Sequence, residues 1–252
     1  MIAEQNVGSD LNAWWSEARS QETGIGAVET AFMSKFTEKG FEFIDHQAAS
    51  REIKVTSAYR TPDLSTDQAR TLANQADAEV VILGKAVAKY YGEIGGGMRS
   101  VQADLTARAV RTDTGQVLAT VTTHAAAVHI TETTAGIEAL KKAGNQAAEE
   151  MLTKILAVYS KETGGTRPVN ITITGLSKQQ FVKFKDVLTK QVRGIRNVSE
   201  RSFSGNVAKV QVDSKSSAQV LSDELALKNF GSFSVEVVGS TANSLELKVT
   251  PK

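Results

Sequence analysis

Apolar and polar residues alternate along two adjoining stretches in the middle of the chain. Every second residue from Val101 to Ala109 is apolar, and the alternation returns from Val117 to Ala127 after the turn sequence Asp113-Thr114-Gly115. A period of two is typical of a strand with one buried face, and such a turn joins neighbouring strands. The pattern therefore predicts a long antiparallel hairpin.

The segments before and after this hairpin in the sequence contain apolar residues at helical spacing. It predicts helices over 25–36, 66–76 and 137–159. Lys39-Gly40 would end the first helix, and Ser65 or Thr66 would cap the second. Phe41, Phe43 and Ile44 predict a short strand, and the apolar run Val80–Leu83, closed by Gly84, predicts a strand covered on both faces. Helices alternating with strands before a hairpin indicate an α+β protein with a mixed sheet.

The last third of the chain has a simpler order of elements. Strand patterns occupy 169–173, 198–203, 208–212, 233–237 and 245–249, and helical patterns occupy 181–192 and 221–225. The predicted order is β-α-β-β-α-β-β, which is close to a ferredoxin-like or split βαβ unit. This βαββαβ-type part is expected to form a smaller second domain.

The boundary between the two parts is predicted near Gly165. The stretch Lys161–Pro168 combines a glycine pair with a proline and has no apolar residue, which favours a linker. We therefore expect domains at 1–163 and 164–252. The first holds 16 Lys and Arg against 21 Asp and Glu, a net −5, and the second holds 13 against 7, a net +6. The whole-chain charge of +1 conceals this difference.

Composition removes several classes of chemistry. The 252 residues include no cysteine and three histidines, so disulfides, thiolate metal sites and cysteine nucleophiles are excluded. The chain has no Gly-x-Ser-x-Gly, no His-x-x-x-His pair and no phosphate-loop lysine. His46, His124 and His129 are expected to be solvated or locally bonded. We expect no catalytic residue, no cofactor and no metal site, and so a protein that is not an enzyme.

Three groups of residues are candidates for contact with a partner. Trp14 and Trp15 are the only tryptophans, and Tyr90 and Tyr91 precede the glycine loop Gly95-Gly96-Gly97, predicted to be a mobile hairpin tip. The third group is basic and lies along one predicted helix and just after it: Lys183, Lys185, Lys190 and Arg193.

Each group also has an alternative interpretation. One tryptophan would pack in the core with the other half-exposed, and the lysines would form a solvated helix face. Nucleic-acid binding by the basic helix 178–196 is the competing function, although the aromatic motif of RNA-binding sheets is absent. A nucleotide-dependent enzyme or hydrolase using Gly24–Gly26 or Gly95–Gly97 is a third hypothesis, without the usual phosphate-binding residues.

The first part of the chain resembles a known family in its motifs. These are Gly40-Phe41-Glu42-Phe43-Ile44-Asp45, Ala76-Asp77-Ala78-Glu79-Val80-Val81-Ile82-Leu83-Gly84 and Thr114-Gly115-Gln116-Val117-Leu118-Ala119, followed by an Ala-rich helix at 139–156. Over about residues 1–160 the chain is similar to the TolB N-terminal-like domain. Relatives include the middle domain of flagellar assembly protein T, the curli secretion lipoprotein and lipoprotein activators of penicillin-binding proteins.

The resemblance implies a non-enzymatic protein of the bacterial cell envelope. Such proteins are periplasmic or associated with the outer membrane, and they scaffold or activate assemblies through protein–protein contacts, with self-association into an oligomer or ring in some. It implies that Met1 lies inside or just after the first strand, so that the sheet edge would be clipped. No signal peptide is evident, and any lipid anchor would lie upstream of Met1.

Overall fold

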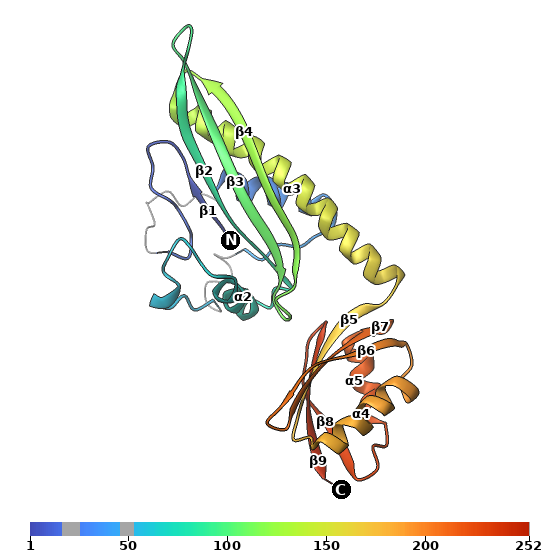
Figure 1. Ribbon diagram of the computed structural model, residues 1–252. Helices are drawn as coiled ribbons and strands as arrows, with labels where there is room; N and C mark the ends of the chain where they lie inside the picture. The colour runs from blue at the N-terminus through green and yellow to red at the C-terminus, as the bar shows by residue number, and fades with distance from the viewer. Residues whose placement is uncertain (17–25, 46–52, 252) are drawn as a thin grey trace. The chain divides into compact units, whose positions relative to one another are not determined.

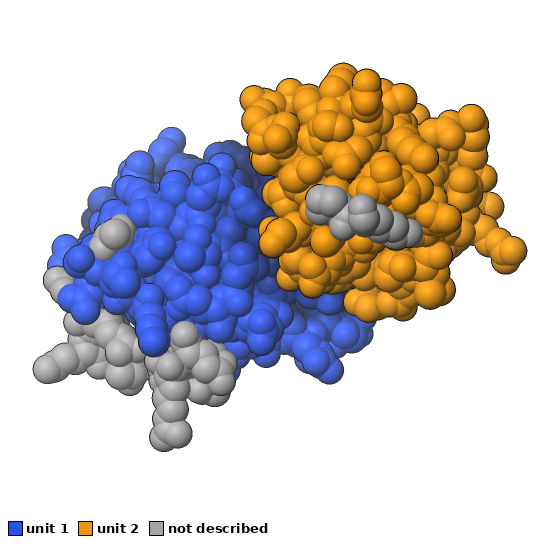
Figure 2. Space-filling model, turned by 90° about the horizontal axis from the view of Figure 1, so that it is seen from below, with its two compact units in different colours: residues 1–156 blue, residues 157–252 orange. Residues whose placement is uncertain are grey.

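The computed structural model describes residues 1–16, 26–45 and 53–251 and shows an α+β protein, as the sequence predicted (Figure 1). The chain forms two compact units, Met1–Leu156 and Ala157–Lys252 (Figure 2). The division falls within helix α3 (Glu132–Gly164). The predicted division lay after residue 163. Dividing the chain after Leu156 instead assigns both Lys161 and Glu162 to the second unit, and because their charges cancel, the net charges of the units stay at −5 and +6.

Unit 1 contains a four-stranded sheet in the order β1-β2-β3-β4. The strands are β1 (Ile2–Gln5), β2 (Val80–Ile94), β3 (Met98–Arg111) and β4 (Val117–His129). β1 pairs in parallel with β2, and the other pairs are antiparallel. The predicted hairpin is confirmed as β3–β4, in which Val101 lies opposite Ala127 and Ala109 opposite Ala119.

Three expectations about the strands of unit 1 are wrong. Gly84 does not end a strand but lies inside β2, where an added Cβ would be 2.8 Å from the Cβ of Ala107. No strand forms at 41–45; Phe41 and Phe43 instead pack edge-on against Phe36, with ring centroids 5.3 Å and 6.0 Å away. The segment Ile2–Gln5, expected to follow the first strand, is itself the strand β1 at the edge of the described sheet.

Two short helices and a 3-10 turn precede β2 in unit 1, and one of the helices begins at a side-chain cap that the sequence predicted. α1 spans Ala27–Thr37, a 3-10 turn spans Ser57–Tyr59, and α2 spans Thr66–Gln75. Ser65 is the N-cap of α2 and forms a capping box with Gln68. The side chains of Leu72 and Ala69 join Trp15, Val81 and Leu83 in a small core on one side of the sheet.

α3 covers the other face of the sheet together with α1 (Figure 1). Its buried stripe is made of small residues over most of its length: Ala135, Gly136, Ala139, Ala143, Gly144, Ala147 and Ala148. The sheet side is also rich in alanine: Ala86, Ala88, Ala103, Ala107, Ala109, Ala119 and Ala127. Thr123 on β4 donates a hydrogen bond to the backbone oxygen of Ala143 at 2.9 Å. Small side chains on both surfaces allow this close contact.

Two carboxylates tie the edge strand to α1. Glu4 on β1 accepts hydrogen bonds from the backbone N–H groups of Ala27 and Val28, at 3.1 Å and 2.8 Å. In return, Glu29 on α1 accepts the backbone N–H of Ile2 at 3.0 Å. A carboxylate at a helix N-terminus satisfies free N–H groups and interacts favourably with the helix dipole. The short strand β1 is therefore held by α1 as well as by β2.

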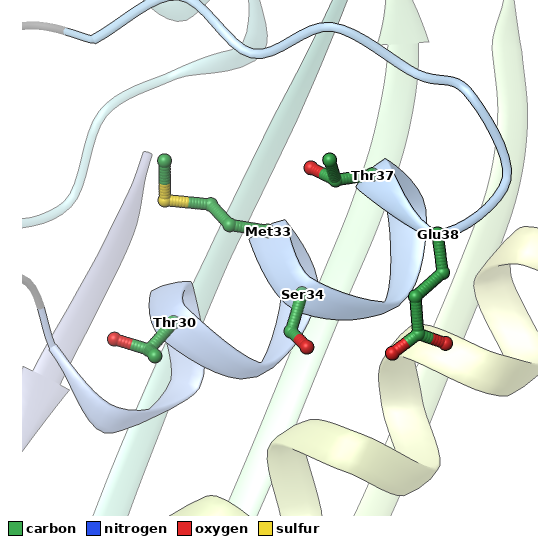
Figure 3. A pocket seen from close by; sticks show the side chains of 5 residues that line it. All are labelled: Thr30, Met33, Ser34, Thr37 and Glu38. Carbon is green, nitrogen blue, oxygen red and sulfur yellow. The ribbon is translucent and has the colours of Figure 1, made fainter.

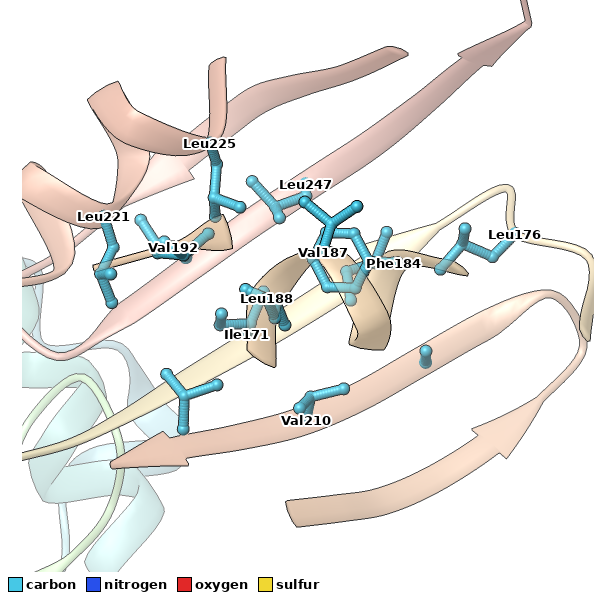
Figure 4. Packing of buried hydrophobic residues seen from close by; sticks show 14 of the residues in the cluster. Ile171, Leu176, Phe184, Val187, Leu188, Val192, Val210, Leu221, Leu225 and Leu247 are labelled. Carbon is cyan, nitrogen blue, oxygen red and sulfur yellow. The ribbon is translucent and has the colours of Figure 1, made fainter. Parts of the chain in front are cut away.

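Unit 2 has the element order that the sequence predicted. It contains β5 (Arg167–Thr174), α4 (Lys178–Gln191), β6 (Ile195–Ser204), β7 (Val207–Ser214), α5 (Ala218–Ala226), β8 (Phe233–Ser240) and β9 (Ser244–Pro251). The sheet order is β6-β7-β5-β9-β8, with β5 and β9 parallel. Apolar side chains of α4 and α5 and of the strands form its core, including Phe184, Leu221 and Ile171 (Figure 4).

The stretch 161–168 is not the loop that its glycines and proline predicted. α3 continues to Gly164, and β5 begins at Arg167. Helix propagation from the long α3 extends through residues that would not start a helix themselves, because each added residue contributes one further hydrogen bond. The composition of this stretch therefore marks the end of a helix, not a linker.

The contact between α1 and α3 provides a stability test. An added Cβ at Gly144 would lie 3.1 Å from both the Cα of Val28 and the Cβ of Ala31. Gly144→Leu should therefore lower the free energy of unfolding by about 2–3 kcal/mol through overpacking. Gln146→Leu, at an exposed position on the same helix, is the control and should change it by less than about 0.5 kcal/mol. Urea denaturation measures both; equal effects would contradict this close contact.

The cap provided by Glu4 predicts a pH dependence. Burial raises the pKa of Glu4 above its usual 4.5, and the bonds from Val28 and Ala27 only partly offset this. The folded state therefore binds this proton more tightly than the unfolded state, so stability falls as the pH rises from 4.5 through the folded-state pKa. Glu4→Gln removes that slope.

Urea titrations of both proteins at a series of pH values measure this difference. The free energy of unfolding of the wild type minus that of Glu4→Gln should decrease from pH 4.5 upward. A difference that is constant or increases with pH would refute the assignment. Glu4→Ala loses both acceptor oxygens and should cost about 1 kcal/mol at neutral pH.

Candidate interaction surfaces

The β2–β3 hairpin ends in an exposed apolar surface. Gly95-Gly96-Gly97 joins the strands, as predicted, and Ile94 lies opposite Met98 at the last pair before this turn. We define the hairpin-end surface by its exposed large apolar residues, which come from β2, β3 and the end of β4: Tyr90, Tyr91, Ile94, Met98, Val128 and Ile130. Tyr91 is 73% exposed and lies where the β2–β3 register shifts, between Tyr90 and Gly92.

The register assigns these residues to the two faces of the sheet. Tyr90 pairs with Val101 and lies on the face covered by α3. Ile94 and Met98 lie on the opposite face, on which Val128 pairs with Ser100. Ser100 on this face is only 8% exposed.

The same uncovered face continues down the sheet as a polar surface. We call it the open face and define it by the exposed charged and histidine side chains of β2, β3 and β4 on that side: Lys85, Lys89, Asp104, Arg108 and His124. His124 pairs with Asp104, its Nδ1 lying 2.6 Å from the carboxylate oxygen. Lys85 binds Asp63 at 3.0 Å.

The two tryptophans lie in different environments. Trp15 is 2% exposed, and its indole N–H donates to the backbone oxygen of Thr61 at 2.7 Å. Trp14 is partly buried and meets Trp15 edge-on at 5.7 Å. Trp15 is therefore a core residue, which corrects its prediction as a contact residue. Its apolar ring is more stable in the core, where its one donor is also satisfied.

The basic helix of unit 2 is partly neutralised by carboxylates. Lys178 and Lys185 on α4 both bind Glu200 on β6, at 3.4 Å and 2.8 Å. Their ammonium groups also lie over aromatic rings, that of Lys185 being 4.9 Å from the centroid of Phe181. Lys190 pairs with Asp186 one turn away. Of the four predicted contact cations, Lys183 and Arg193 are the exposed ones without an ion pair among the described residues.

The outer edge of the unit 1 sheet is shielded by lysines. β4 is an edge strand, and two of its backbone oxygens accept hydrogen bonds from α3: Ala126 from Lys142 at 3.3 Å and Thr120 from Lys154 at 2.7 Å. An edge with unpaired backbone groups would otherwise bind another strand. The lysines oppose strand addition at β4.

A shallow depression lies along the outer side of α1. Thr30, Met33, Ser34, Thr37 and Glu38 line it at helical spacing (Figure 3). One carboxylate, three hydroxyls and a thioether do not form an acid–base pair or a nucleophile with its base. This depression therefore has no evident catalytic constellation.

Metal-binding and membrane-spanning features were sought in the same residues. The described residues contain no group of three or more His, Asp or Glu that could hold a metal ion. Within residues 1–16, 26–45 and 53–251, no helix is long and apolar enough to cross a membrane. His124 and His129 lie on and at the end of β4 in local hydrogen bonds, whereas His46 and Gly24-Ile25 lie outside the described residues.

Comparison with known families identifies the first unit. Residues 17–152, more than half of the chain, match the family described as TP0693-like lipoprotein, C-terminal domain. The chain belongs to this family. It is therefore related to bacterial envelope lipoproteins, and the predicted envelope association holds at this level. Comparison with curated proteins gave no match.

Three solved structures resemble this lipoprotein-family protein, with low sequence identity and low TM-scores. A Caulobacter crescentus CB15 structure, provisionally called a lipoprotein, has 8% identity and a TM-score of 0.26, covering 55% of this chain and 88% of its own. The hypothetical protein CT253 of Chlamydia trachomatis has 12% identity, a TM-score of 0.29, and coverages of 64% and 92%. XCC0632 of Xanthomonas campestris, a DUF330 protein, has 18% identity, a TM-score of 0.22, and coverages of 32% and 51%.

Sequence reasoning missed most of the hairpin-end surface. Tyr90 and Tyr91 were predicted as contact residues beside the glycine loop, which Met98 also flanks, but Ile94, Met98, Val128 and Ile130 were not predicted as contact residues. A signal existed, because Ile94 and Met98 directly flank the three glycines, where turn chemistry favours polar residues. Exposed apolar residues beside such a turn form a candidate interaction surface.

The ion pairs on α4 predict how Glu200 titrates. The hydrogen bond from Lys185 is the main cause that holds the pKa of Glu200 below its usual 4.5, with Lys178 contributing less and burial opposing. The stabilisation is present above 4.5 and is lost as the pH falls through the folded-state pKa. Carboxyl-detected NMR titration should show a larger pKa increase for Lys185→Met than for Lys178→Met. Equal increases would contradict the leading role of Lys185.

Proposed function

We propose that this lipoprotein-family chain is a non-enzymatic structural or assembly factor of the bacterial envelope that acts through protein–protein contacts. The observation that carries the proposal is the pair of separately cored units with different exposed surfaces. Unit 1 has a net charge of −5 and an apolar hairpin end, and unit 2 has a net charge of +6. Different surfaces on one chain suit a protein that connects other components.

The protein partner is proposed to bind unit 2 near α4. Lys183 projects beside Gly231, and Arg193 and Arg196 are exposed just after the helix. Lys183 and Arg196 have no ion pair with the described residues, and Arg193 interacts with Glu224 only at longer range. These three cations therefore favour an acidic protein surface. Lys178, Lys185 and Lys190 contribute less because they are already paired.

The finer resemblance remains part of this proposal. A relationship to TolB N-terminal-like domains, flagellar assembly protein T or penicillin-binding-protein activators would suggest assembly of a larger envelope machine. Self-association into an oligomer or ring and a periplasmic or outer-membrane-associated location belong to the same proposal. The motifs at Gly40–Asp45, Ala76–Gly84 and Thr114–Ala119 support it.

Nucleic-acid binding is the competing function. It would use the same cations of unit 2, and its affinity would fall steeply with salt. Two internal pairs to Glu200 and one to Asp186 remove much of the cationic track that a phosphate backbone would follow along α4. The geometry therefore favours a localised protein contact over a strand of phosphates.

Photo-cross-linking in the bacterium tests the proposed function. A benzoylphenylalanine residue at position 183 should cross-link the full-length protein to an envelope protein, and the charge reversals Arg193→Glu and Arg196→Glu should abolish that product. Position 209, exposed on β7, is the control and should give no such product. Cross-linking to nucleic acid, or to no envelope protein at all, would refute the proposal.

A further inference from the structure

The open face and the part of the hairpin-end surface on the same side of the sheet, which excludes Tyr90, form one amphipathic side of unit 1. Ile94, Met98 and Val128 occupy its end, and the cations lie farther along the same side. Lys89 pairs across the strands with Gln102, Lys85 with Thr106, and Arg108 lies next to Thr106 on that face. On this side α2 packs only at the other end of the sheet, around Val81 and Leu83, and Leu83 pairs with the exposed Arg108 (Figure 1).

The charge of this side differs from that of the rest of the unit. Unit 1 has a net charge of −5, yet its open face carries three cations, Lys85, Lys89 and Arg108. Two carboxylates lie beside them: Asp63 binds Lys85 at 3.0 Å, and Asp104 is paired with His124. Lys89 and Arg108 have no ion pair with the described residues. A local cationic field on an acidic unit favours an anionic surface.

The apolar end is a protrusion and not a groove. An added Cβ at Gly92, Gly95, Gly96 or Gly97 would meet no atom within 4 Å, so nothing in the described chain packs around the tip. A folded protein needs a matching pocket to bury such a tip, whereas a bilayer interface deforms around it. Tyrosine, here at positions 90 and 91, is enriched at that interface.

The charges at the tip are arranged away from this side. Glu93 and Arg99 form a cross-strand pair on the face toward α3, where Arg99 also binds Glu132. Ile94 and Met98, between them in sequence, lie on the open side. The hairpin can therefore place its aliphatic side chains in an apolar layer while its ion pairs remain in water.

We propose that this side of unit 1 binds the surface of a membrane that contains anionic phospholipid. Tyr91, Ile94, Met98 and Val128 enter the interface, and Lys89, Lys85 and Arg108 contact lipid phosphates. Basic residues and shallowly inserted apolar side chains act together in such peripheral binding. Membership of a family described as lipoproteins is consistent with this partner. The proposal concerns unit 1 and goes beyond the protein contact proposed for unit 2.

Vesicle flotation with the full chain tests the proposal. The probes are vesicles of phosphatidylethanolamine with phosphatidylglycerol, and vesicles of phosphatidylcholine alone. The wild type should float with the first and much less with the second. The double variant Tyr91→Ser/Ile94→Ser and the double variant Lys89→Glu/Arg108→Glu should each lower partitioning by about tenfold or more. Only the second loss should depend strongly on salt.

Matched variants keep the outcome interpretable. Val182→Ser/Leu227→Ser changes exposed apolar residues of unit 2, and Lys183→Glu/Arg193→Glu changes its charge; both should float like the wild type. All substituted side chains are exposed, and unchanged thermal transitions would confirm folding. The protein contact proposed for unit 2 is tested separately, by cross-linking at position 183. Failure of one proposal therefore does not imply failure of the other.

Four results would overturn the membrane proposal. The first is that the wild type floats with neither kind of vesicle. The second is that the Tyr91→Ser/Ile94→Ser variant floats as well as the wild type. The third is that the Lys183→Glu/Arg193→Glu variant of unit 2 no longer floats. The fourth is a dimer, measured by light scattering, that Tyr91→Ser/Ile94→Ser dissociates while the wild type ignores vesicles. That last result would show that a second copy covers the surface.

Discussion

The close contact between α3 and the unit 1 sheet is the constraint on which the rest of that unit depends. Alanine and glycine line the buried side of α3 and alanine lines the facing strands, Thr123 of β4 donates a hydrogen bond to the backbone oxygen of Ala143, and Gly144 lets α1 approach α3. Burial of small side chains contributes less apolar area per residue than leucine would. Small side chains instead allow dense packing along the long helix α3. A cavity made there by a substitution would have few neighbouring side chains able to fill it. α1 in turn holds β1 through Glu4 and Glu29.

This packing leaves the opposite side of the hairpin uncovered toward its tip. α2 and the Trp15 core cover the lower part of that side, around Val81 and Leu83, and the covering ends before Lys89. The strands continue for several residues beyond this cover. The exposed end is thus presented by a sheet that α3 supports from behind, so a contact there meets a preorganised surface and loses little conformational entropy.

Sequence patterns predicted elements best where periodicity reflects burial. The β3–β4 hairpin and all seven elements of unit 2 followed from alternation and helical spacing. The predictions failed where a residue type had a different structural role from the one assumed. Phe41 and Phe43 pack against Phe36 without forming a strand, and Gly84 makes room for Ala107 inside β2 without ending it. The candidate surfaces could be predicted only in part, because spacing along the chain does not reveal tertiary neighbours. Trp15 is buried and donates to the backbone oxygen of Thr61, 46 residues away, whereas Tyr91 stays exposed.

The sheet edges determine which kind of contact remains open to this protein. Lys142 and Lys154 shield β4, and β1 bridges to Asn12 on its outer side. In unit 2 both edge strands, β6 and β8, carry register shifts, and such bulges interrupt the regular ladder that an added strand needs. Recognition by strand addition is therefore opposed at each of these edges. The exposed side chains differ between the units: apolar and cationic together on the hairpin of unit 1, cationic on unit 2. The two proposed contacts, with a membrane for unit 1 and with an acidic protein for unit 2, correspond to this difference.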